Sequence, residues 1–239
     1  MSNAAANVPS DASPEMPVQP AHATAAAPAD LANRFGCVTD AVVERLETFA
    51  ALLCQWQTTH NLVGPEALGN LWSRHIEDSL QLADLAPDAR HWVDLGSGAG
   101  FPGLIVAIAR ADEPKFRATL IESNQKKAAF LRTAIRATGA PAGIFAGRIE
   151  TYIEDFAAAQ TDPADVISAR ALAPFADLCR LAFPLMRPET RLILLKGQDF
   201  VHEEQVASKS WSYDLLTLPS VTDQNGRIVT VTNLRPKDS

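Results

Sequence analysis

The stretch Val93–Gly103 reads Val-Asp-Leu-Gly-Ser-Gly-Ala-Gly-Phe-Pro-Gly and predicts a strand, a glycine-rich turn and the start of a helix. Pro102 suits the first turn of a helix because its φ angle is already helical. Glycines let a backbone approach a ligand closely and adopt positive φ angles. The N–H groups at the start of the following helix can then face a polar or anionic group. This turn is therefore the first candidate for a ligand-binding site.

The chain around this turn alternates short apolar strands with helices. The expected strands are His91–Leu95, Ala118–Glu122, Gly143–Ala146, Val166–Ala169 and Arg191–Lys196. The expected helices between them are Pro102–Arg110, Gln125–Thr138, Ile149–Ala159 and Pro174–Met186. Two further strand-like runs, Tyr213–Leu218 and Arg227–Leu234, flank the turn residues Asp223–Gly226. The order predicts an α/β fold with a mostly parallel, seven-stranded sheet that ends in an antiparallel hairpin.

Residues 31–88 show helical periodicity instead. Large apolar residues recur every three or four positions from Val42 to Trp56, with Thr39 or Asp40 as the cap of the helix. A second helical stretch runs roughly from Ala67 to Asp84. We expect a helical extension over residues 31–88, packed as one unit with a Rossmann-like domain over residues 89–239.

Residues 1–30 contain ten Ala and five Pro and no Lys or Arg. Such a segment has almost nothing large to bury, so we expect a disordered tail. It also lacks the basic start and continuous apolar core of a secretory signal.

Composition narrows the class of protein. Apolar residues make up 47% of the chain and charged residues 21%, which suffices for a core. The net charge of −7 excludes a protein that holds nucleic acid by bulk charge alone. The apolar runs are too short to cross a bilayer. Cys37, Cys54 and Cys179 show no CxxC spacing, which argues against disulfides or a zinc site and favours a cytoplasmic protein with no metal.

Two ligands compete for the glycine turn. Gly98–Gly103 fits G-x-G-x-x-G, the dinucleotide fingerprint. Gly96, Gly98 and Gly100 form G-x-G-x-G directly after the strand, the usual S-adenosylmethionine loop of Rossmann-like methyltransferases. The second interpretation is favoured because the tight turn begins at Gly96, where the strand ends. A glycine-rich turn without a ligand is the third alternative.

Two later segments favour a nucleoside ligand. Glu122 ends the second strand, where an acid accepts hydrogen bonds from ribose hydroxyls, although a solvated strand-end acid has the same position. Gly147–Glu150 follows the third strand, beside the expected place of the adenine. Glu150 near a helix start equally suits the helix dipole.

Several separate segments together resemble one family. They are Asn61–Val63, Arg74–Ser79, Val93–Gly103, Gly147–Glu150, Ser168–Ala171 and Leu195–Gln198. The chain resembles, over about residues 40–235, the glucose-inhibited division protein B family of 16S ribosomal RNA guanine-N7 methyltransferases. The resemblance implies the class I methyltransferase fold and S-adenosyl-L-methionine as cofactor. It implies cofactor contacts at Gly96, Phe101, Ile149, Glu150 and Arg170, and Glu122 matches the acidic strand end of the family. The glycine loop itself adds Asp94, Gly98 and Gly100 as expected cofactor-binding residues.

The implied reaction explains why no general base is found. Guanine N7 carries its own lone pair, so its methylation removes no proton. No catalytic triad or metal-ligand spacing occurs in the chain. Arg170 and Lys196 end the fourth and fifth strands at the edge where ligands bind, and we expect them to position the substrate or the cofactor carboxylate. The alternative is that both are ordinary surface cations.

Further residues are candidates for contact with the RNA or the cofactor site. Arg74, His75 and Asp78 share one predicted helix, where an Arg74–Asp78 ion pair is the alternative role. The second set is a basic helix face, which is solvated in most proteins but suits phosphate binding here. Its members are Lys126, Lys127, Arg132 and Arg136.

The expected partner is 16S ribosomal RNA, either in the 30S subunit or in an assembly intermediate, and the expected state is a cytoplasmic monomer without membrane contact. Two other functions remain open from the sequence. One is an NAD(P)-dependent oxidoreductase, and the other is a non-catalytic nucleotide-binding or ribosome-binding protein on the same fold.

Overall fold

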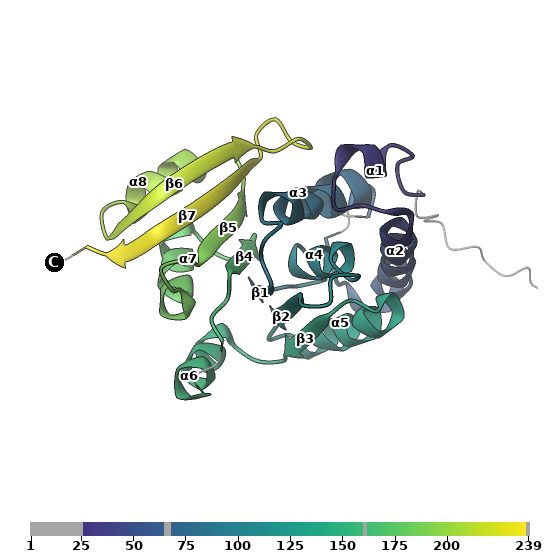
Figure 1. The fold of residues 1–239 in the computed structure, drawn as a ribbon, viewed down its shortest axis with the longest axis horizontal. Helices are drawn as coiled ribbons and strands as arrows, with labels where there is room; N and C mark the ends of the chain where they lie inside the picture. Colours follow the sequence, from purple (N-terminus) through teal and green to yellow (C-terminus); the bar gives the residue numbers. More distant parts are fainter. Residues whose placement is uncertain (1–25, 65–67, 160–161, 238–239) are drawn as a thin grey trace, which may run out of the picture.

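The computed structural model describes residues 26–64, 68–159 and 162–237. Its sheet contains seven strands in the order β3-β2-β1-β4-β5-β7-β6 (Figure 1). The parallel strands are β1 (His91–Leu95), β2 (Arg117–Ile121), β3 (Ala142–Phe145), β4 (Val166–Arg170) and β5 (Arg191–Lys196). Their bounds lie within one residue of the sequence prediction, because each is a short apolar run between breakers. The predicted sheet is therefore confirmed.

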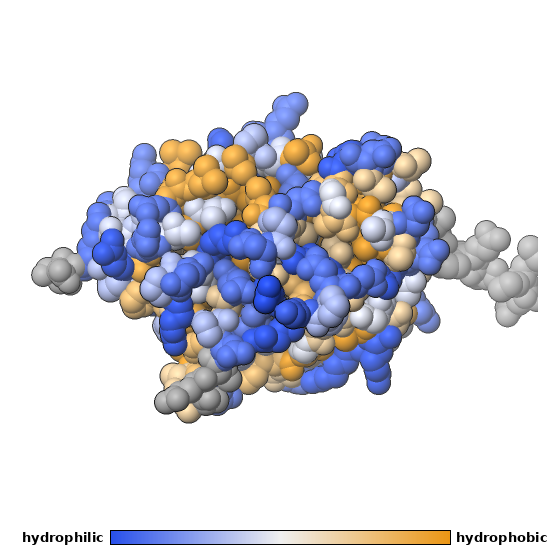
Figure 2. All heavy atoms as spheres, viewed as in Figure 1, coloured by the Kyte–Doolittle hydropathy of each residue, from blue (hydrophilic) through white to orange (hydrophobic). Residues whose placement is uncertain are grey.

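The C-terminal hairpin closes the sheet on one side. β7 (Arg227–Pro236) pairs antiparallel with β5, and β6 (Trp211–Pro219) pairs with β7 at the edge. Figure 2 shows apolar residues gathered over this hairpin, where Leu216 and Val221 are exposed. Both predicted strands exist and are longer than predicted.

Helices cover both faces of the sheet (Figure 1). α4 (Gly103–Ala109) and α5 (Gln125–Thr138) share one hydrophobic cluster with the N-terminal helices α1 (Leu31–Arg34), α2 (Asp40–His60) and α3 (Glu77–Leu85). The opposite face is covered by α6 (Ile149–Ala159), α7 (Phe175–Ala182) and α8 (Phe200–Ala207). A 3-10 turn, Phe183–Leu185, continues α7. α1 and α8 were not expected from the sequence.

α2 joins the N-terminal helices to the sheet domain. Thr39 caps it by accepting a hydrogen bond from the Val42 N–H at 3.3 Å. Its buried Phe49 packs edge-on against Phe101 of the glycine turn and tilted against Phe130 of α5. The extension and the sheet domain thus share one core, because the apolar face of α2 packs against α5 and the glycine turn.

Two expectations about the N-terminal part need correction. The helical stretch expected roughly from Ala67 to Asp84 consists, in its described residues, of a π-helical segment, Leu71–Ile76, followed by α3, while Ala67 lies outside the described residues. Simple apolar spacing does not distinguish π from α geometry, and π segments occur often at functional sites. Residues 1–25 of the expected tail lie outside the described residues. Among the described residues, the Ala27 N–H donates to Glu47 of α2 at 3.3 Å, so a contact with the helical extension is present before the expected boundary at residue 30.

Candidate active site

The glycine turn between β1 and α4 needs glycine for steric reasons. Gly96 and Gly98 have φ angles of 67° and 58°, in the left-handed region that L side chains rarely adopt. A Cβ atom on Gly96 would also lie 2.7 Å from Leu172 Cδ1, in the loop after β4. The turn therefore lies directly beside the end of β4, at the point where the strand order of the sheet reverses. Open α/β sheets bind ligands at such points.

Asp94 supports this turn from below. Its side chain is fully buried and accepts hydrogen bonds from Ser168 Oγ at 2.6 Å and from the Gly103 N–H at 3.2 Å. Trp92 Nε1 in turn donates to Ser168 Oγ at 2.8 Å. Burial raises the pKa of Asp94 to about 6. In this structure the Asp94 carboxylate fastens α4 to β4 and has no exposed surface, which is a structural role beside the predicted cofactor contact.

Glu122 holds the turn from the side. One carboxylate oxygen accepts a hydrogen bond from the Gly98 N–H at 2.8 Å, and the other accepts from the Asn124 N–H at 2.6 Å. A carboxylate oxygen has two lone pairs, so each retains an acceptor site for a ligand. The position is as the sequence predicted, and the contact with Gly98 adds a structural role.

A first cavity of about 520 Å³ opens between the glycine turn, the end of β2 and the start of α6. Its lining contains Gly96, Gly98, Lys127 and Arg170, together with Glu122, Ile149 and Glu150. Three other predicted cofactor residues, Asp94, Gly100 and Phe101, are not among the residues that line this cavity. The sequence did not single out Arg148 or Leu172, which also line it. Leu172 carries no local signal, because only the fold brings it against Gly96.

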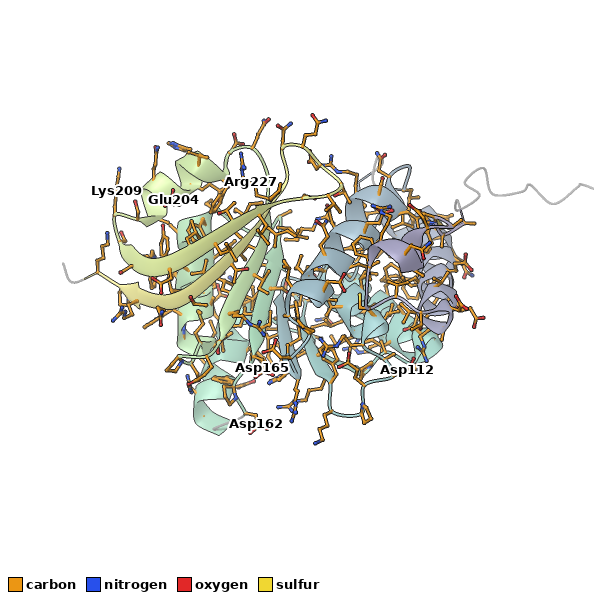
Figure 3. The ribbon with its side chains drawn as sticks, turned by 45° about the horizontal axis from the view of Figure 1, so that its top comes forward. Asp112, Asp162, Asp165, Glu204, Lys209 and Arg227 are labelled. Atoms are coloured by element: carbon orange, nitrogen blue, oxygen red, sulfur yellow. The ribbon has the colours of Figure 1, made fainter. Side chains whose placement is uncertain are left out.

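A second cavity, of about 410 Å³, adjoins the first and shares Arg170, Ala171 and Leu172 with it. Of the predicted residues, it is also lined by Arg74, Asp78 and Lys196. Its polar lining residues that the sequence did not single out are Glu203, Ser220, Asp223 and Arg227. The hairpin supplies three of these four. Figure 3 shows Arg227 at one end of the sheet, and Asp162 and Asp165 at the other.

Arg170 lies between the two cavities. Its Nη2 donates to the Arg74 carbonyl oxygen at 2.8 Å, and its guanidinium lies 6.0 Å from the centre of the Phe101 ring. Nη1 is buried and has no hydrogen-bond partner among the described residues. Burial lowers the pKa of Arg170, and Arg74 lowers it further, while Asp78 raises it. Arg170 therefore has a donor free for a ligand at the junction of both cavities.

His75 packs behind Arg170 and lines neither cavity. Its ring lies 5.1 Å from the Phe101 ring, at an interplanar angle of 33°. Burial lowers the pKa of His75 to about 4, with smaller contributions from Arg170 and Arg74. His75 is thus neutral at physiological pH and belongs to the packed wall behind the site.

Arg74 and Asp78 do not pair with each other, contrary to the alternative that the spacing allowed. Arg74 forms an ion pair with Asp223 of the hairpin loop at 2.8 Å. Asp78 accepts hydrogen bonds from Ser220 and Thr222 of the same loop. Both residues therefore tie the helical extension to the β6–β7 loop and form one wall of the second cavity.

Lys196 is neutralised by a partner on α8. Its Nζ lies 2.5 Å from a carboxylate oxygen of Glu203 and donates to the Ala173 carbonyl oxygen at 3.2 Å. The same oxygen of Glu203 accepts from the Phe175 N–H at 2.7 Å. Lys196, which was expected to position the substrate, is thus half of an ion pair, and the sequence did not indicate this partner because α8 was not expected.

The basic face of α5 is divided. Lys127 lines the first cavity, whereas Lys126, Arg132 and Arg136 are exposed farther along the surface. None of these three forms an ion pair within the described ranges of the chain.

In the part of the chain that the structure describes, no group of three or more His, Cys, Asp or Glu side chains is arranged to hold a metal ion. No described helix has the length and apolar character needed to span a membrane.

Solved structures support the fold. The chain superimposes on an O-methyltransferase from Bacillus cereus in complex with S-adenosylhomocysteine with a TM-score of 0.51 and 17% identity, covering 82% of this chain and 92% of that one. The O-methyltransferase TomG from Streptomyces achromogenes, in complex with S-adenosylmethionine, matches with a TM-score of 0.51 and 14% identity over 82% and 90% of the two chains. These similarities confirm the predicted methyltransferase fold.

Sequence comparison is more specific. The ribosomal RNA small subunit methyltransferase G of a Bradyrhizobium species is 45% identical over 188 residues, 79% of this chain and 83% of that protein. The protein of the same name from Methylorubrum populi is 42% identical over 201 residues, 84% and 93% of the two chains. The family model of GidB, rRNA small subunit methyltransferase G, matches residues 42–229. The resemblance of the motifs is confirmed, and the chain belongs to the rRNA small subunit methyltransferase G family.

Proposed function

We propose that this protein transfers a methyl group from S-adenosylmethionine to N7 of one guanine in 16S ribosomal RNA. The observation that carries the proposal is a pair of adjoining cavities that share Arg170–Leu172 in a member of this family. The first cavity takes the cofactor and the second takes the guanine. The oxidoreductase alternative is not supported, because the family is one of methyltransferases.

The residues of the first cavity fit the cofactor by their chemistry. Glu122 offers two carboxylate oxygens, fixed by backbone N–H groups, to ribose hydroxyls. Ile149 and Leu172 supply apolar surface for a nucleobase, and the unpartnered Nη1 of Arg170 suits a carboxylate or an RNA oxygen. When bound, the cofactor supplies an electrophilic methyl group on a positively charged sulfur.

The residues of the second cavity position the base and need not remove a proton. With the cofactor bound, the N7 lone pair would form the new bond to the methyl carbon while the methyl–sulfur bond breaks, so that S-adenosylhomocysteine would leave uncharged and the positive charge would pass to the guanine. The remaining requirement is alignment, to which Arg170 and the wall formed by Asp78 and the hairpin loop contribute. Lys196 and Glu203 form an ion pair there that has no net charge. A neutral pair suits a base on which positive charge develops.

The wider setting follows from the same proposal. We propose that the protein acts in the cytoplasm, as a monomer, on the 30S subunit or on an assembly intermediate. Lys127 and Arg148, which line the first cavity, are cations suited to phosphates, although Arg148 also lies 3.5 Å from a carboxylate oxygen of Glu150. Lys126, Arg132 and Arg136 extend this surface along α5.

The test uses 30S subunits from a strain that lacks the modification, incubated with radiolabelled S-adenosylmethionine. Borohydride reduction followed by aniline cleaves RNA at 7-methylguanine, so a single cut in treated 16S RNA is expected. Labelled RNA that resists aniline would overturn the N7 assignment, and unlabelled RNA would overturn the activity. Calorimetry should show binding of S-adenosylhomocysteine and none of NAD, whereas binding of NAD alone would restore the oxidoreductase alternative.

A further inference from the structure

The second cavity contains more positive than negative side chains. Four cations line it, and three carboxylates lie beside them. The cations are Arg74, Arg170, Lys196 and Arg227, and the carboxylates are Asp78, Glu203 and Asp223. The wall therefore carries one positive charge in excess, and the pairing of the side chains decides where that charge is located.

Three of the four cations have partners. Arg74 pairs with Asp223 at 2.8 Å, and Lys196 pairs with Glu203 at 2.5 Å. Arg170 donates to the Arg74 carbonyl oxygen; burial lowers its pKa, and the nearby Asp78 carboxylate opposes this effect. The partners of Arg74 and Lys196 are carboxylates, so these two cations are unavailable to an anionic ligand unless the ligand displaces a carboxylate.

Arg227 differs from the other three. Its side chain has neither a hydrogen bond nor an ion pair within the ranges that the structure describes, and its Nε is buried without a partner. It begins β7 and lies directly opposite Lys196 of β5 in the antiparallel register. Opposite residues in such a pair present their side chains to the same face of the sheet. Arg227 is therefore a cation without a side-chain partner, located beside the neutralised Lys196.

A cation in this position does not suit contact with the reacting atom. A hydrogen bond to guanine N7 would occupy the lone pair that forms the new bond. A positive charge against the base would also oppose the charge that develops there. A backbone phosphate next to the target guanine suits such a cation better. Its oxygens are anionic and accept hydrogen bonds from the paired N–H groups of a guanidinium.

We infer that Arg227 binds a backbone phosphate of the RNA next to the target guanine and so anchors the strand at the second cavity. The inference rests on the proposed function and extends it with a substrate-binding residue. The division of roles follows from the pairing: Lys196 with Glu203 forms a neutral wall for the base, and Arg227 supplies the charge for the phosphate.

The test compares Arg227→Gln and Arg227→Ala with Arg235→Gln. Arg235 is a matched control because it is an exposed arginine on the same strand, at the far end from the cavity. Methyl transfer to 30S subunits is measured against RNA concentration, and RNA binding is measured by filter retention between 50 and 200 mM salt. Calorimetry with S-adenosylhomocysteine shows whether each variant is folded and has an intact first cavity.

Both Arg227 variants should raise KM for RNA about tenfold or more with a smaller change in kcat. The slope of log affinity against log salt should fall by about 0.7–0.9, the value for one lost phosphate contact, with unchanged affinity for S-adenosylhomocysteine. Arg235→Gln should behave as the unmodified protein. An unchanged salt slope, or a loss confined to kcat, would overturn the inference. Failure of the unmodified protein to methylate would overturn the proposed function instead.

Discussion

The Gly98 N–H donates a hydrogen bond of 2.8 Å to the Glu122 carboxylate, which joins the glycine turn after β1 to the end of β2. The other oxygen of Glu122 accepts from the Asn124 N–H at the start of α5. A single side chain thus fixes the shape of the turn and presents acceptor oxygens to the first cavity. Binding and local stability are therefore coupled at this residue.

Replacing Glu122 by Ala should weaken binding of S-adenosylhomocysteine by about 1.5–3 kcal/mol, the range for hydrogen bonds to a charged group. The melting temperature should also fall, because the Gly98 and Asn124 N–H groups lose their acceptor. Glu122→Gln keeps one carbonyl acceptor, so its affinity and melting temperature should lie between those of the unmodified protein and Glu122→Ala. Calorimetry and thermal melts check both effects, and full affinity in Glu122→Ala would remove the residue from the binding site.

The buried Asp94 should make stability depend on pH. Its pKa is about 6 in the folded protein and near 3.8 when unfolded, so the folded state binds the proton more tightly. The tighter proton binding by Asp94 in the folded state increases the free energy of unfolding below about pH 4, and this increase is lost as the pH rises through 6. The loss is up to about 3 kcal/mol at 1.36 kcal/mol per pKa unit.

Asp94→Asn provides the comparison, because it cannot titrate. Urea denaturation between pH 4 and 7 should show that the stability advantage of the unmodified protein over this variant shrinks as the pH rises. A constant difference across this range would mean that Asp94 has an ordinary pKa in the folded state.

Replacing Glu203 by Gln should lower kcat. The substitution keeps the size of the side chain but leaves Lys196 as an uncompensated cation in the second cavity. The positive charge that develops on the guanine is then repelled by the charge of Lys196. An increase of about 1.4 kcal/mol in the activation free energy would make methyl transfer roughly tenfold slower. Single-turnover kinetics with saturating RNA measure this step. If the rate were unchanged, the neutrality of the pair would have no part in catalysis.

The chemical step should show no titrating base between about pH 7 and 9. Guanine N7 loses no proton, and the pKa of His75, about 4, keeps that side chain neutral throughout this range. We expect a flat plot of log kcat against pH under single-turnover conditions. A unit slope with an inflection inside this range would show that a protein group must lose or gain a proton.

Removing residues 1–25 should leave both the melting temperature and the affinity for S-adenosylhomocysteine unchanged. The described contacts with α2 begin at Ala27, whose N–H donates to Glu47. Removing residues 1–30 deletes this contact and the Pro28 carbonyl that accepts from the Leu31 N–H, so a lower melting temperature is expected. A large effect of the shorter deletion would show that the first 25 residues contribute to the fold.

Much of the architecture was predictable from the sequence because the signals are local. The predicted bounds are correct for four elements, β1, β5, α5 and α6. The strands are short apolar runs, and the ends of α5 are marked by Asn124 at its N-cap and Gly139 at its C-cap. The glycine turn directly follows β1, and Glu122 directly follows β2, as the ends of the apolar runs predicted within one residue. Motifs spread over the chain sufficed to indicate the family.

Tertiary structure alone decided how the polar residues are used. Asp94 supports the turn because β4 brings Ser168 against its carboxylate. Lys196 is neutralised because α8 presents Glu203. Arg74 pairs with Asp223 of the hairpin loop, which is far away in the sequence. A charged side chain takes its role from its nearest partner and its burial. Both depend on segments that are distant in the sequence, so periodicity and spacing identify the elements of this protein but not the pairing of the charges between them.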